Sequence, residues 1–144
     1  MACVMRSLGL WFIGFVAFVC MDLCWIGFIA SGLYRSQIGQ FMNIVNDRAV
    51  VNVPAALGTW VLLVTGIQLF VLPRAAQAPG TGSLLFWGAL YGLILYGVYD
   101  LTNYAVVKGW PLAISFVDML WGGFACAVAT LIMGLAGRAL GLIQ

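Results

Sequence analysis

The sequence predicts an all-α membrane protein, a four-transmembrane-helix bundle that forms a single integral membrane domain over residues 1–144. Hydrophobic residues make up 65% of the chain and charged residues 7%, whereas a soluble domain carries about 25% charged residues. Four stretches reach the length of about 20 mostly apolar residues that a spanning helix needs. They are continuously apolar and lack the alternation of a membrane β-barrel. We therefore expect a multi-pass integral membrane protein whose first partner is the lipid bilayer.

Charge and composition exclude several classes of function. The net charge is +2 and no basic cluster is present, so nucleic acid is not an expected partner. The chain has no histidine, the residue that most often serves as a general base or a metal ligand. Cys20 and Cys24 share a helix face, but no C-x-x-C or Cys/His set accompanies them. We expect neither a metal site nor a cofactor.

The four expected helices cover approximately residues 8–31, 49–72, 83–107 and 111–136. The second is bounded by Pro73, and the fourth has Pro111 at a favourable position in its first turn. We call the N-terminal side of the membrane side A and the opposite side B. With four spans, the first and third helices end on side B, and the second and fourth begin there.

The connections between these helices differ in character. Residues 32–48 hold enough apolar side chains for a short helix lying at the membrane interface between the first two spans. Residues 73–82 are rich in Pro and Gly and are expected to form a flexible loop. The link KGW is so short that the last two helices should form an antiparallel hairpin, in which Gly88 and Gly92 allow close helix contact. The remaining aromatic residues are expected to be mostly interfacial anchors or packing residues: Tyr34, Trp60, Trp87 and Trp110.

Three related strings place aspartates inside the apolar helices: MDLCWIGF at residues 21–28, YDLTNYAV at 99–106 and VDMLWGGF at 117–124. An intramembrane carboxylate costs about 2.5–3.5 kcal/mol on insertion scales. Each acid should lie roughly 10–14 Å below the side-B boundary, given the rise of 1.5 Å per residue. The three carboxylates are therefore expected to face the interior of the bundle at one depth.

Polar and aromatic neighbours extend this set. Tyr96, Asp100 and Asn103 share one face of the third helix, and Asn52 of the second helix lies at the level of Asn103. A tryptophan follows each of the other two acids by three residues. The candidate residues for binding a ligand or a proton are accordingly Asp22, Asp100, Asp118, Asn103, Asn52, Tyr96, Trp25 and Trp121.

Three interpretations of these residues stay open. The first is a carboxylate-lined site that binds a proton, a cation or a small polar or cationic ligand, in transport or in binding. The second is a buried polar network that fixes helix packing, and the third is a site completed by another protein. No nucleophile–base pair or phosphate loop is recognisable, so no catalytic residue is predicted.

The strings MDLCWIGFIASGLYRSQIG, YDLTNYAVVKGWP and VDMLWGG resemble the predicted membrane proteins of domain-of-unknown-function family 2177, over nearly the whole chain. The resemblance implies a small four-helix membrane protein and no particular activity. Gly58-Thr59-Trp60 departs from the more aromatic run of the family. The family's signature positions correspond to Asp22, Trp25, Tyr34, Asp100, Asn103, Trp110, Pro111, Asp118 and Trp121.

These observations leave three hypotheses of function. The best supported is a small binding or transport protein with its site at the aspartates. Because four helices are few for a conduction path, that protein would form a homo-oligomer. An alternative is a non-catalytic accessory or structural subunit of a larger membrane complex. A second alternative is a membrane enzyme that acts on a lipid or a small apolar substrate, and this alternative has no recognised catalytic set behind it.

Overall fold

The computed structural model describes residues 2–46, 48–78 and 80–143. Within these residues, four helices are long and apolar enough to cross a membrane: Val4–Ile29, Val53–Ala75, Thr81–Val106 and Leu112–Ala139. The predicted all-helical bundle with four spans is therefore confirmed. Large apolar side chains are exposed on every span, as hydrocarbon-facing surfaces require.

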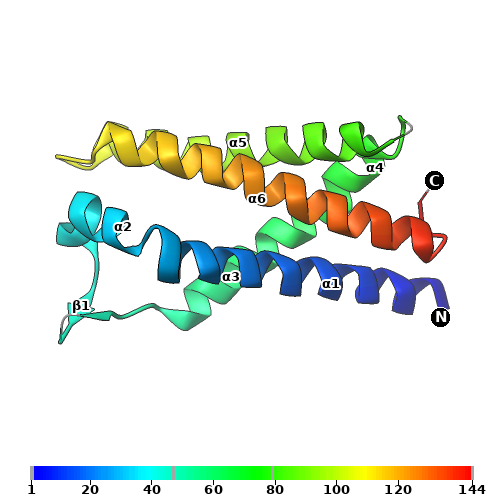
Figure 1. The fold of residues 1–144 in the computed structure, drawn as a ribbon, viewed down its shortest axis with the longest axis horizontal. Helices are drawn as coiled ribbons and strands as arrows, with labels where there is room; N and C mark the ends of the chain where they lie inside the picture. The colour runs from blue at the N-terminus through cyan, green and yellow to red at the C-terminus, as the bar shows by residue number, and fades with distance from the viewer. Residues whose placement is uncertain (1, 47, 79, 144) are drawn as a thin grey trace.

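The first span is longer than expected at its start and leads directly into a short helix. Helix α1 covers Ala2–Cys24, continues as a π-helical turn over Trp25–Ile29, and is followed by α2 at Ser31–Ile38 and a 3-10 turn at Gly39–Phe41. The predicted short helix between the first two spans is thus present. It lies at the end of the bundle opposite the two termini (Figure 1).

A small β-hairpin follows α2 and delays the second span. Strands β1 (Ile44–Val45) and β2 (Arg48–Ala49) pair in antiparallel fashion. Helix α3 (Val53–Gly66) therefore begins four residues later than the sequence indicated, and Asn52 is its N-cap. The pattern of apolar residues could not show whether this segment is extended or helical, because the same apolar residues are compatible with either conformation.

The second span also passes through the proline that was expected to end it. A π-helical turn at Ile67–Val71 precedes α4 (Leu72–Ala75), and Pro73 lies in the first turn of α4. Proline lacks the N–H that an uninterrupted α-helix uses. The change of hydrogen-bond register in the π-turn supplies a new helix start, at which that missing donor does no harm.

The last two helices form the predicted antiparallel hairpin. Helix α5 covers Thr81–Val106 and α6 covers Leu112–Ala139. A Cβ atom on Gly88 would lie 2.7 Å from the carbonyl oxygen of Cys126, so the backbones touch here because the residue is glycine. The turn between the helices contains Gly109 at φ +79°, a conformation that favours glycine.

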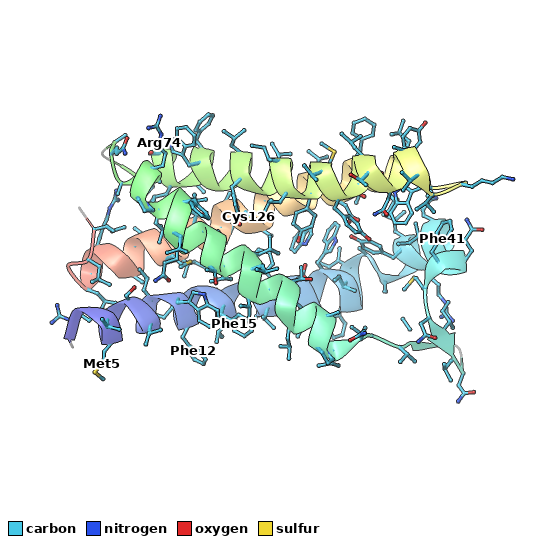
Figure 2. All side chains as sticks on the ribbon, turned by 180° about the vertical axis from the view of Figure 1, so that it is seen from behind. Met5, Phe12, Phe15, Phe41, Arg74 and Cys126 are labelled. Carbon is cyan, nitrogen blue, oxygen red and sulfur yellow. The ribbon has the colours of Figure 1, made fainter. Side chains whose placement is uncertain are left out.

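Helix α6 is the central element of the bundle. Figure 1 shows α1, α5 and α6 running along the long axis while α3 crosses them diagonally, from the α2 end towards the start of α5. Met5 and Phe12 project away from the bundle in Figure 2, whereas Cys126 lies among the helices. The buried apolar core joins all four spans: Leu10, Phe18, Leu63, Val64, Ile67, Val71, Leu72, Ala75, Leu84, Ala125, Cys126, Ala129 and Met133.

Candidate functional site

Three buried aspartates occupy the side-B half of the bundle. Asp22, Asp100 and Asp118 are 7%, 0% and 7% exposed. Each lies six or seven residues inside the side-B end of its span, which corresponds to a depth of about 10 Å. We call these aspartates, together with the side chains that contact them, the polar layer.

Asp22 of α1 receives two hydrogen bonds from indole groups on two other helices. The Nε1 of Trp60 in α3 lies 2.7 Å from Oδ2, and the Nε1 of Trp121 in α6 lies 3.0 Å from Oδ1. Indole nitrogen is a donor only, so both bonds suit an acceptor carboxylate. Each oxygen of Asp22 has its own donor, and the carboxylate links α1 to α3 and α6.

Asp118 of α6 is held by the short helix α2. The hydroxyl of Tyr34 donates to Oδ1 of Asp118, and the Nε1 of Trp25 donates to the Tyr34 oxygen at 3.2 Å. The π-helical turn that begins at Trp25 and the helix start at Ser31 lie between α1 and Tyr34, and α2 contacts α6. This contact brings Tyr34 to an acid 84 residues away in sequence.

Two stacked tryptophans join the environments of Asp22 and Asp118. The ring centroids of Trp25 and Trp121 lie 4.4 Å apart and their planes differ by 4°. The two carboxylates themselves interact electrostatically. In the sequence, each tryptophan follows an acid by three residues. In the structure, each serves the other acid: Trp121 donates to Asp22, and Trp25 acts on Asp118 through Tyr34.

Asp100 of α5 is the most buried acid and is held differently. Within the part of the chain that the structure describes, neither of its oxygens has a hydrogen-bond partner. Ser115 lies beside the carboxyl group; its hydroxyl accepts a hydrogen bond of 3.1 Å from the Nε1 of Trp110 and keeps its own O–H to donate. An ionised carboxylate in this buried position would depend on the Ser115 hydroxyl for a donor, and burying a charge with so little compensation costs several kcal/mol.

The other predicted site residues lie at different distances from the layer. Tyr96 packs its ring against Gly122 and interacts electrostatically with Asp22 and Asp100. Asn103 is half-buried, and its side-chain nitrogen has no hydrogen-bond partner within the described ranges. Asn52 is exposed and caps α3 by accepting from the Ala55 N–H at 3.2 Å, so it does not reach the aspartates.

Sequence reasoning missed three residues that contact the aspartates. Trp60 and Tyr34 were expected to be interfacial anchors or packing residues, and they instead donate to Asp22 and Asp118. Trp60 lies seven residues inside α3, at the depth of the acids, and this would have been visible with the correct helix start at Val53. Ser115 precedes Asp118 by three residues and shares its helix face.

The polar layer does not form a compact metal-binding cluster. Among the described residues, no three His, Cys, Asp or Glu side chains converge closely enough to hold a metal ion together. The layer consists of one network, built on Asp22 and Asp118, and one separate acid, Asp100. Neutral donors satisfy the carboxyl groups at two positions, and the third carboxyl group keeps unused hydrogen-bonding capacity among the described residues.

Comparison with known proteins agrees with this architecture. A family model described as "Predicted membrane protein (DUF2177)" matches residues 8–135. The chain belongs to the DUF2177 family. The match covers all four spans almost completely and includes every residue of the polar layer, so these side chains are part of the DUF2177 domain. No curated protein and no solved structure matches the chain.

Proposed function

We propose that this chain is a small membrane protein that binds a proton or a small cation inside the bilayer, with Asp100 as the group that receives the positive charge. The observation that carries the proposal is the contrast between the acids. Asp22 and Asp118 accept hydrogen bonds from tryptophan and tyrosine, whereas the fully buried Asp100 accepts none among the described residues.

This contrast favours a binding role for Asp100 over a purely structural one. Buried polar groups that stabilise packing normally have their hydrogen bonds satisfied, and Asp22 fits that description. A buried carboxyl group without donors is stable only when it carries a proton or contacts a positive charge. Ionisable groups inside membrane spans commonly mark proton and ion pathways.

The remaining acids support Asp100 in this proposal. The hydrogen bonds of Asp22 and Asp118 hold α1, α2, α3 and α6 together around the layer. When ionised, these two carboxylates raise the local affinity for a cation, because screening is weak away from bulk water. The structural and the functional interpretations of the sequence therefore apply to different aspartates.

The experiment is a flux measurement in liposomes that contain the purified protein and an internal pH-sensitive dye. An imposed proton or cation gradient should decay faster with the wild-type protein than with Asp100→Asn. The matched control is Asn52→Ser, which keeps a good helix cap and lies outside the layer; its flux should equal that of the wild type. Equal flux in wild type and Asp100→Asn, or none above empty liposomes in either, would refute the proposed role in transport.

A further inference from the structure

A crevice opens towards the lipid beside the polar layer, where α3 diverges from α5. Its volume is about 570 Å³, within the range of about 300–1,000 Å³ that is typical of small-molecule sites. Leu62 and Leu63 of α3 and Leu95 of α5 supply apolar walls. The diagonal course of α3 away from α5 is visible in Figure 1.

Three tyrosines of α5 line the opposite wall of this crevice: Tyr91, Tyr96 and Tyr99. The Tyr91 hydroxyl donates to the carbonyl oxygen of Leu63 at 3.3 Å and so ties α5 to α3. Tyr99 is 58% exposed. Aromatic faces of this kind attract cations, and the attraction is strongest where water is excluded.

Tyr96 connects the crevice to the buried acids. It lines the crevice and lies near Asp22 and Asp100. None of the three aspartates itself lines the crevice, so a ligand there would contact tyrosine rings and leucines while the carboxylates act on it from behind. A ligand would therefore touch an apolar and aromatic wall, and ionised aspartates behind that wall would make the potential there negative.

We propose that this crevice binds a lipophilic organic cation that enters sideways from the bilayer. Apolar walls suit the hydrocarbon part of such a ligand, and the tyrosine faces and the carboxylates suit its positive charge. The inference rests on the proposed function in one respect, since it uses Asp100 as the acceptor of positive charge. A neutral lipid chain would gain nothing from the acids, and an anion would be repelled by them.

The test uses two probes of the same shape and opposite charge, tetraphenylphosphonium and tetraphenylborate. Binding of each to the purified full-length protein in nanodiscs is measured by equilibrium dialysis. The phosphonium should bind saturably and at least tenfold more tightly than the borate. Equal binding of both ions, or no saturable binding of the phosphonium, would show that the crevice does not recognise cations.

Two substitutions on exposed leucines locate the binding. Leu62→Trp fills the crevice from a side chain that is 74% exposed, and it should weaken phosphonium binding at least tenfold. Leu120→Trp makes the same change at a lipid-facing position of α6 that is 69% exposed and lies outside the crevice, and it should change affinity less than twofold. The opposite order of effects would place the probe elsewhere and overturn the inference.

The Asp100→Asn variant separates this inference from the proposed function. At a pH high enough to ionise Asp100, it should lower phosphonium affinity at least fivefold because it removes the charge behind Tyr96, and unchanged affinity at that pH would contradict the inference. If wild-type protein fails to bind phosphonium but still shows Asp100-dependent proton or cation flux, the crevice inference alone is wrong. If the flux is absent as well, both proposals fail.

Discussion

The indole nitrogen of Trp60 lies 2.7 Å from Oδ2 of Asp22 and joins α3 to α1 at the level of the buried acids. Helix α3 crosses the bundle diagonally (Figure 1) and contacts α1 at this point. Lipid offers helices no hydrophobic drive to associate, so interhelical hydrogen bonds and close packing decide the arrangement. This single bond therefore has a large share in positioning the start of α3.

Removing that donor should destabilise the bundle. Trp60→Phe keeps an aromatic ring but leaves Oδ2 of Asp22 without its donor. The free energy of unfolding in detergent should fall by about 1–2 kcal/mol. A double-mutant cycle with Asp22→Asn should give a coupling energy of about 1 kcal/mol. Trp87→Phe provides the control, because Trp87 packs against Phe86 and Arg74, and its coupling to Asp22→Asn should be near zero.

The contact between Tyr34 and Asp118 should hold α2 against the bundle. Tyr34→Phe removes the hydroxyl that donates to Asp118 and accepts from Trp25. Loss of about 1 kcal/mol corresponds to about a fivefold change in an equilibrium. Amide hydrogen exchange in residues 31–41 should accelerate by that factor, while Tyr104→Phe, at an exposed position on α5, should leave it unchanged. Identical exchange in the two variants would show that the contact does not dock α2.

Close packing of α5 on α6 depends on glycine at position 92. A Cβ atom on this residue would collide with the backbone of Gly122, and overpacking of this kind costs about 1–3 kcal/mol. Gly92→Ala should lower the unfolding free energy by that amount. Gly58→Ala in α3 meets no atom within 4 Å and should instead raise stability by about 0.5–1 kcal/mol. A stable Gly92→Ala protein would mean that the helices do not pack as described.

The acids should differ in the sign of their contribution to stability. At alkaline pH, Asp100→Asn removes a buried charge that has no donor among the described residues, and it should raise the unfolding free energy by about 1 kcal/mol. Asp22→Asn replaces one acceptor oxygen by an amide donor facing an indole N–H, so it should lower stability by about 1–2 kcal/mol. A denaturant titration of helix content measures both changes. Destabilisation by Asp100→Asn equal to that of Asp22→Asn would indicate a structural role for both acids.

The sequence predicted the four spans and the shared depth of the aspartates, because length, apolar content and helical rise determine both. It did not predict that the second span starts at Val53 and continues past Pro73, since a β-hairpin and a π-turn leave no distinct pattern of hydrophobicity. Depth alone also could not assign donors to acceptors. Those pairings depend on the diagonal crossing of α3 and on the contact of α2 with α6, and both are properties of helix packing.

Tyr34 and Trp60 illustrate this limit. Anchoring at the membrane interface is the usual role of such aromatic residues, and only the folded chain directs their polar atoms at Asp118 and Asp22. Asn52 is the opposite case: the sequence placed it among the candidate site residues, but its side-chain oxygen accepts a hydrogen bond within the first turn of α3. Local capping by Asn competes with any longer-range contact.

The most direct test of the central claim is infrared difference spectroscopy of the carboxyl groups during a pH titration in nanodiscs. Wild-type protein should show the carbonyl stretch of a protonated carboxylic acid, which disappears as the pH rises. That band should be absent from Asp100→Asn and retained in Asp118→Asn, because Asp118 accepts a hydrogen bond from Tyr34 and Asp100 accepts none among the described residues. A band that persists in Asp100→Asn and is lost from Asp118→Asn would contradict the assignment of Asp100 as the group that receives the positive charge.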